Sequence, residues 1–221
     1  MAIDRHAGES TTARVPARAR AHSARGGGTT GNERLTAATG AVLIVLLAVI
    51  GVTIISLSRL LWVHLFVGML LLGPVALKLG STGYRFVRYY TANRSYREKG
   101  PPAAALRLIA PLVVASTLTV FASGVALLFV GPSSRGTLLP IHKVSFFVWV
   151  AFMAIHVLAH LPAVARALHA DYVDPALGGR QAPGRNGRAL SLLGALVGGV
   201  VIAILVIPQF APWISSQQFH H

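Results

Sequence analysis

Cysteine is absent from the 221 residues of this chain. Its absence excludes disulfides, iron–sulfur clusters, thiolate zinc sites, covalent attachment of a c-type haem and thiol catalysis. Any metal that the protein holds is therefore bound through nitrogen or oxygen atoms.

Acidic residues are nearly as scarce, and all six lie outside the long apolar stretches: Asp4, Glu9, Glu33, Glu98, Asp171 and Asp174. Transporters coupled to protons or cations usually carry a carboxylate near mid-membrane. This chain has none in its apolar stretches, so the sequence gives little support to a transporter. A hydrolase built on paired carboxylates or on a Ser-His-Asp arrangement within the bilayer is unsupported for the same reason. No GxGxxG motif follows a predicted strand, so the sequence contains no nucleotide- or flavin-binding motif. If the protein takes part in redox chemistry, its electrons have to come from a quinol or from another protein.

Hydrophobic residues make up 54% of the chain and charged residues only 12%, with a mean hydropathy of +0.63. Five windows are long and apolar enough to cross about 30 Å of hydrocarbon. They are Thr36–Ile55, Leu60–Leu79, Ile109–Gly131, Ile141–Ala165 and Ala189–Ile207. None alternates like a barrel strand, and lipid requires every backbone group to be bonded within its segment. The sequence therefore predicts an all-α integral membrane bundle of five transmembrane helices over residues 36–215.

The net charge of +14 is unevenly distributed along the chain. Six of the 20 basic residues precede the first window, seven lie from Lys78 to Arg107, and four from Arg166 to Arg188. With five crossings, all of these 17 residues lie on one side of the membrane. Only Arg59, Arg135 and Lys143 lie on the other side. The positive-inside rule thus predicts a multi-pass protein of the cell's inner (plasma) membrane with a cytoplasmic N-terminus. Contact with anionic lipid explains the charge, and no nucleic acid partner is expected, because the basic loops are separate and lack aromatic platforms.

Residues 1–35 are rich in Ala, Arg, Gly and Thr and show no apolar periodicity, so we expect a disordered basic cytoplasmic tail. It does not resemble a signal peptide, because its charged stretch is too long and the first window can remain as an uncleaved anchor. Among the prolines, Pro74 is predicted to kink the second helix, Pro111 to lie near the start of the third, and Pro162 to end the fourth.

Histidine and lysine nitrogens recur at two matched depths of the second and fourth windows. His64 is followed after fourteen residues by Lys78, and His142 after fourteen residues by His156. Fourteen residues advance a helix by about 21 Å and leave both side chains within roughly 40° of one face. Both windows enter from the external side, so His64 is expected to face His142. Two neutral imidazoles on facing helices can coordinate one haem iron axially; interfacial packing of the two rings is the alternative.

The inner level is less regular, because Lys78 stands opposite His156. A neutral lysine amine can bind iron, a charged one can pair with a haem propionate, and a third possibility is that Lys78 extends to the cytoplasmic headgroups. We expect His156 to be the inner ligand. His160, on the same helix face, is expected either to contact a ligand or a propionate, or to be an interfacial residue before Pro162. The HxxxH spacing also occurs in zinc and di-iron sites, but the glutamate of zincins is missing.

Arg85 and Arg88 follow the second window among aromatic residues, in Ser-Thr-Gly-Tyr-Arg-Phe-Val-Arg-Tyr-Tyr. An interfacial belt of Tyr and Arg is one interpretation, and pairing with the propionates of a cofactor on the cytoplasmic side is the other. Small residues would let a macrocycle or a neighbouring helix approach closely: Gly68, Gly73, Ser116, Ser123 and Gly124. Gly194 and Gly198 have the GxxxG spacing of helix packing or dimerisation.

This layout of His64, His142 and His156, with Gly68 one turn after the first ligand, resembles the small bacterial membrane cytochrome b superfamily. That superfamily includes cytochrome b561-like, nickel–iron hydrogenase cytochrome b and ferric-reductase-like membrane proteins. The resemblance covers the helical part from about Leu60 to Leu161, and the haem-binding core is expected within residues 60–165. It implies haem b, with one haem expected and a second allowed, and electron transfer between a quinol or cytoplasmic donor and a redox partner. Lys78 departs from the two-haem pattern, in which the second helix carries histidine at both levels.

Two classes of function are therefore in competition. The first is a transmembrane electron-transfer protein, or the membrane subunit of an oxidoreductase, with haem between the second and fourth helices. Its partners are the bilayer and a quinol or redox protein, and a homodimer or a complex with a redox subunit is compatible with it. The second is a haem-free membrane scaffold or anchor, whose histidines are structural and whose tail recruits a cytoplasmic partner.

Overall fold

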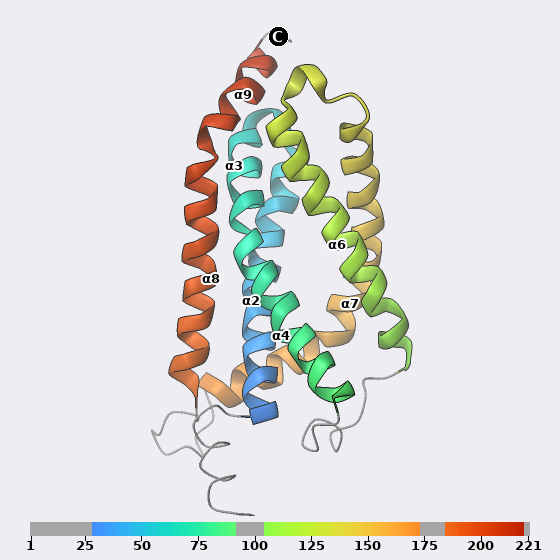
Figure 1. Cartoon of the computed structure of the whole chain (residues 1–221), viewed down its shortest axis with the longest axis vertical. Coiled ribbons are helices and arrows are strands. Elements are labelled where there is room, and N and C mark those ends of the chain that lie inside the picture. The colour runs from blue at the N-terminus through green and yellow to red at the C-terminus, as the bar shows by residue number, and fades with distance from the viewer. Residues whose placement is uncertain (1–27, 92–103, 173–183, 219–221) are drawn as a thin grey trace, which may run out of the picture.

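The computed structural model describes residues 28–91, 104–172 and 184–218, and every element in these ranges is helical (Figure 1). Five helices are long and apolar enough to cross a membrane. They are Thr29–Ile55, Leu57–Tyr90, Leu108–Val130, Leu138–His169 and Arg185–Leu205. Each overlaps one of the predicted windows. The prediction of an all-helical chain with five candidate spans is confirmed.

The first span is α2 (Gly28–Ile55), and the second is divided into α3 (Leu57–Leu70) and α4 (Leu72–Tyr90). The others are α6 (Ala104–Val130), α7 (Leu138–Tyr172) and α8 (Arg185–Leu205), with short helices η1 (Pro132–Ser134), η3 (Ile207–Phe210) and α9 (Ala211–Gln218). Successive spans run in opposite directions (Figure 1). We call the end that carries α9 the α9 end, and the opposite end, where α2 begins and α4 ends, the basic end.

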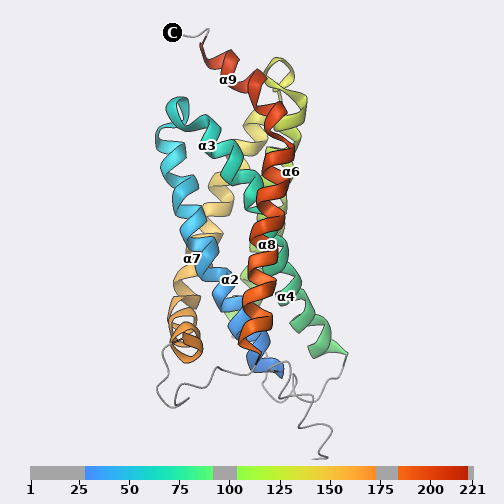
Figure 2. The same ribbon diagram turned by 90° about the vertical axis from the view of Figure 1, so that its left-hand side faces the viewer.

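The second and fourth spans lie across the bundle from one another. α2 contacts α3, α4 and α7, while α6 contacts α7 and α3. The fifth span, α8, packs outside this ring on α3, α4 and α2 (Figure 2). Side chains of α3 and α7 that point into the ring therefore face each other between α2 and α6.

The break in the second span follows from Pro74, which is buried in the first turn of α4. In a continuous helix the N–H of residue 74 would donate to the carbonyl oxygen of Leu70. Proline has no N–H, so this hydrogen bond is missing. Gly199 of α8 packs so closely that a Cβ there would overlap the Leu70 carbonyl oxygen, and a Cβ on Gly73 would overlap the carbonyl oxygen of Ala195. The glycine Cα–H groups thus point at these oxygens, as in many close helix crossings. The predicted kink is confirmed, and Gly199, rather than Gly194 or Gly198, makes the close approach.

Pro111 lies inside α6 but in the first turn of the third span, Leu108–Val130, near its start as predicted. Two other predicted boundaries are wrong. α7 continues through Pro162 to Tyr172. α2 begins at Gly28, so residues 28–35 are helical and do not belong to a disordered tail; the rest of that tail lies outside the described residues. A proline removes one backbone hydrogen bond, and the remaining bonds of a long helix can sustain it.

The most buried apolar cluster lies toward the α9 end. Met69, Leu128, Ala203 and Phe210 form it, and Trp213 and Ile214 of α9 pack against it. The indole N–H of Trp213 donates to the carbonyl oxygen of Leu128 at 3.4 Å. This cluster fixes α3, α6 and α8 relative to one another at the level where His64 lies.

Candidate functional site

His64, on α3, is held by Thr53 of α2, whose side chain is 1% exposed. The Thr53 hydroxyl donates its single hydrogen to the carbonyl oxygen of Ile50 at 2.6 Å. Its oxygen also lies 2.9 Å from Nδ1 of His64, so in this contact it acts as the acceptor and Nδ1–H donates. This arrangement favours the neutral tautomer with the proton on Nδ1, which presents an unprotonated Nε2.

His142, on α7, is held in the same way by α6. Its Nδ1 lies 3.1 Å from the carbonyl oxygen of Val120, which can only accept, and 3.0 Å from the hydroxyl of Ser123. A Cβ on Gly124 would lie 3.1 Å from Cε1 of His142, so α6 approaches the ring closely where it has no side chain. His142 therefore also carries its proton on Nδ1 and presents Nε2.

We call His64 and His142 the α9-end pair. They come from helices that lie across the ring from each other, with α2 on one side and α6 on the other. Among the described residues, Nε2 of neither histidine makes a hydrogen bond. Two imidazoles anchored through Nδ1–H, each with a free Nε2, form the donor set that metal-ligating histidines present.

Lys78 on α4 and His156 on α7, which we call the basic-end pair, are held differently. Nζ of Lys78 donates to the carbonyl oxygen of Thr36 on α2 at 2.7 Å, and a Cβ on Gly40 would lie 3.0 Å from Nζ. The half-buried amine is thus directed at α2. A backbone carbonyl near the start of the first predicted window therefore binds one hydrogen of the amine, and the interpretation that Lys78 extends to the headgroups stays a prediction.

Polar side chains around Lys78 join α2 to α4. The Thr36 hydroxyl lies 3.0 Å from the Ser81 hydroxyl, and the Asn32 amide donates to the Ser81 carbonyl oxygen at 3.1 Å. Such hydrogen bonds between membrane helices contribute about 1 kcal/mol each. The surroundings of Lys78 therefore fit a role in helix packing.

His156 and His160 stack on each other, with ring centroids 4.4 Å apart and an interplanar angle of 27°. Nδ1–H of His160 donates to the carbonyl oxygen of His156 at 2.9 Å. No described residue forms a hydrogen bond with the ring of His156. The predicted inner ligand therefore lacks the anchor that both members of the α9-end pair have.

Arg85 and Arg88 lie on α4 beyond Lys78, toward the basic end. Arg85 forms an ion pair with Glu33 at 3.5 Å, with the two side chains 40% and 31% exposed. Arg88 lies 5.9 Å from the Tyr84 ring, and its buried Nε has no hydrogen-bond partner in the described structure. Arg85 follows His64 by twenty-one residues, or about 30 Å of helix, so neither arginine can contact a cofactor at the α9-end pair.

Within the described ranges, no group of three or more His, Asp or Glu side chains could enclose a bare metal ion. The α9-end pair provides two nitrogen ligands, the number that a haem iron needs from a protein when its macrocycle supplies four. The donor set therefore fits a haem better than an isolated ion. The small Gly124 next to His142 is the other feature that fits a flat ring.

Sequence reasoning identified the histidines and the small residues Ser123 and Gly124, but it missed Thr53 and the Val120 carbonyl. Thr53 is one of the few hydroxyls in its window, and it lies close to the α9 end of that window, as His64 does in the next one. That depth is the signal that could have identified it. No sequence pattern predicts which backbone carbonyl an imidazole will reach.

Comparisons with protein-family models, with curated proteins and with solved structures gave no match. The site is therefore interpreted from its own geometry.

Proposed function

We propose that this chain is an electron-transfer protein of a membrane, in which His64 and His142 hold the iron of one b-type haem between α3 and α7. The observation that supports this most strongly is the tautomer shared by the two rings. The Thr53 oxygen and the Val120 carbonyl oxygen each accept from Nδ1–H, which directs an unprotonated Nε2 away from the anchoring helix. A structural histidine has no need to leave this nitrogen without a partner in an apolar interior.

When bound, the haem would supply the one-electron redox chemistry. The helices would set its properties. Thr53 and Ser123 fix the orientation of the two imidazoles, and hydrogen bonds from Nδ1–H make an imidazole a stronger donor to iron. The apolar cluster around Met69 and Phe210 excludes water on the side of α3 and α8.

We place the protein in the plasma membrane as a multi-pass protein, with the N-terminus cytoplasmic and the α9 end external. The basic residues support this, because Arg59, Arg135 and Lys143 alone lie in the segments at the α9 end. The α9-end pair would then exchange electrons near the outer leaflet, with a quinol or a redox protein as partner, either as a separate carrier or as the membrane subunit of an oxidoreductase.

We propose one haem, not two. Lys78 is bound to α2, and none of the residues that the structure describes anchors the His156 ring, so the basic-end pair lacks the arrangement seen at the α9 end. The competing function, a haem-free scaffold, would require the α9-end histidines to serve packing alone.

The test is the dithionite-reduced minus oxidised spectrum of the detergent-purified protein, with haem and iron quantified per chain. We expect the Soret and α bands of a low-spin b-type haem at one haem per chain, and none in His64→Ala. A colourless wild-type protein, even after haem is supplied during expression, would favour the scaffold. Full retention of low-spin haem in His64→Ala would refute the ligand assignment.

A further inference from the structure

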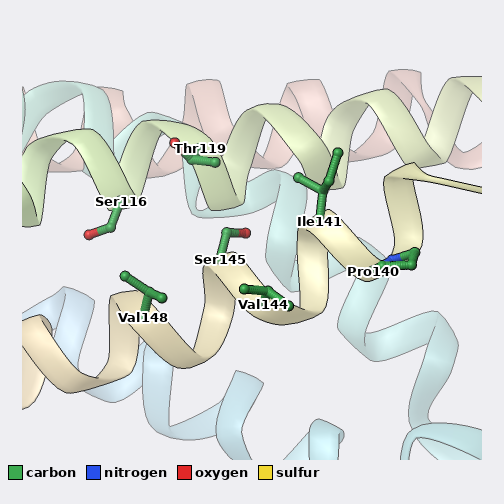
Figure 3. Close-up of a pocket in the computed structure, with 7 residues that line it drawn as sticks. All are labelled: Ser116, Thr119, Pro140, Ile141, Val144, Ser145 and Val148. Carbon is green, nitrogen blue, oxygen red and sulfur yellow. The ribbon is translucent and has the colours of Figure 1, made fainter.

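A groove of about 470 Å³ lies between α6 and α7. Ser116 and Thr119 line it from α6, and residues between Pro140 and Val148 line it from α7 (Figure 3). The two helices diverge toward the α9 end, where the segment with η1 joins them (Figure 1). The groove is therefore a wedge between two diverging helices.

The polar groups in the groove are already satisfied. The hydroxyls of Ser116, Thr119 and Ser145 donate to carbonyl oxygens of their own helices at 2.7, 2.9 and 3.0 Å. No hydroxyl hydrogen is left for an occupant, and the remaining walls are apolar side chains. The groove is thus suited to a hydrocarbon chain and poorly suited to a polar molecule.

The groove is open to the surroundings of the bundle. Ile141, Val144 and Val148 are 43%, 62% and 45% exposed. If α6 and α7 span a bilayer, acyl chains are the surroundings on this face, and a chain can enter sideways.

Two cations lie at the same end of this hairpin. Arg135, just after η1, and Lys143, in the second turn of α7, are both exposed. No acidic residue occurs between Glu98 and Asp171, so the hairpin itself carries no carboxylate for them. Glu33, the acidic residue whose side chain is described, pairs with Arg85 at the basic end. The α6–α7 hairpin thus presents an apolar wedge next to two cations without a carboxylate.

We propose that this groove binds one anionic phospholipid, with an acyl chain between α6 and α7 and the phosphate near Arg135 and Lys143. The proposal rests on membrane insertion, which is part of the proposed function, but it does not depend on haem. The lipid would fill the wedge and stabilise α7, which carries His142.

The experiment is native mass spectrometry of the full-length protein, delipidated and then titrated with phosphatidylglycerol or with phosphatidylcholine of the same chains. We expect one tightly bound phosphatidylglycerol. Val148→Trp should fill the groove and reduce binding of both lipids at least tenfold. The double variant Arg135→Gln/Lys143→Gln should lose roughly thirtyfold in affinity for phosphatidylglycerol only, since each basic residue near an anionic surface contributes a factor of roughly five.

Val201→Trp on α8, at a position 47% exposed, is the matched control and should bind lipid like the wild type. An equal loss in Val201→Trp and Val148→Trp would mean non-specific annular lipid and would overturn the proposal. So would unchanged binding in Val148→Trp, or a tightly held isoprenoid that phosphatidylglycerol does not displace. Circular dichroism checks that Val148→Trp is folded; if it is not, unaltered lipid preference in the double variant overturns the proposal.

The failures of the two proposals are separable. A colourless protein that binds phosphatidylglycerol in the groove would refute the haem site alone. A haem-containing protein without a specific lipid would refute the lipid site alone. Failure to co-float with liposomes would refute membrane insertion, on which both rest.

Discussion

At the α9 end, His64 and His142 each have a hydrogen-bond acceptor from a neighbouring helix, and within the described helices neither Nε2 has a partner. At the basic end, Lys78 is bound by the Thr36 carbonyl, and no described residue anchors the ring of His156. The two levels have the same fourteen-residue spacing, and yet they are built differently. Spacing brings nitrogen atoms to the same depth, but only the surrounding acceptors determine which lone pairs are free.

The largest expected difference is between His142→Ala and His156→Ala. We expect the first variant to lose haem completely, because one axial ligand and its anchors on α6 are lost together. His156→Ala should keep one haem per chain. The pyridine haemochrome assay on purified protein measures haem per chain. Loss of haem in His156→Ala but not in His142→Ala would show that the haem is held at the basic end.

Thr53→Val should weaken haem binding by about 10- to 100-fold, the usual effect of removing the partner of a ligating histidine. The matched control is Thr36→Val, which removes a threonine hydroxyl from the same helix at the basic end. That control should bind haem like the wild type. Haem transfer to an apo-myoglobin acceptor gives both affinities, and equal values for the two variants would contradict the role of Thr53.

Gly124→Ala should reduce haem occupancy severalfold, because the new methyl group would lie 3.1 Å from Cε1 of His142 and displace the ring. Gly51→Ala is the control, since nothing lies within 4 Å of a Cβ at that position. It should leave haem unchanged and stabilise α2 by about 0.5–1 kcal/mol. The ligand-field signals in electron paramagnetic resonance spectra would show the change in ring orientation, and identical spectra for both variants would argue against it.

Lys78→Met should have the smallest effect on haem, namely none. It should lower the free energy of unfolding by about 1 kcal/mol, because the hydrogen bond from Lys78 to the Thr36 carbonyl is lost. Fluorescence-detected size-exclusion chromatography after heating measures the stability. A loss of absorbance at the α band in this variant would show that Lys78 belongs to a cofactor site after all.

Much of the architecture could be predicted from the sequence. The five apolar windows, the Pro74 kink and the placement of His64 and His142 on helices that lie across the bundle follow from apolar length, proline chemistry and helical period. The continuation of α7 through Pro162 could not, because a single missing hydrogen bond does not decide whether a long helix ends. The direction of the Lys78 side chain depends on Gly40 and Thr36 of another helix, and local sequence contains no information on such a tertiary contact.

The break at Pro74 has a consequence for biogenesis. The Leu70 carbonyl lacks the N–H donor that residue 74 would otherwise supply, and Gly199 of the fifth described span covers it. If the spans insert into a bilayer in chain order, this carbonyl faces lipid or another transient partner until α8 is in place, at a cost in free energy. The second span would then reach its final conformation only after synthesis of α8, and a nascent chain that stops before α8 should be a substrate for membrane quality control.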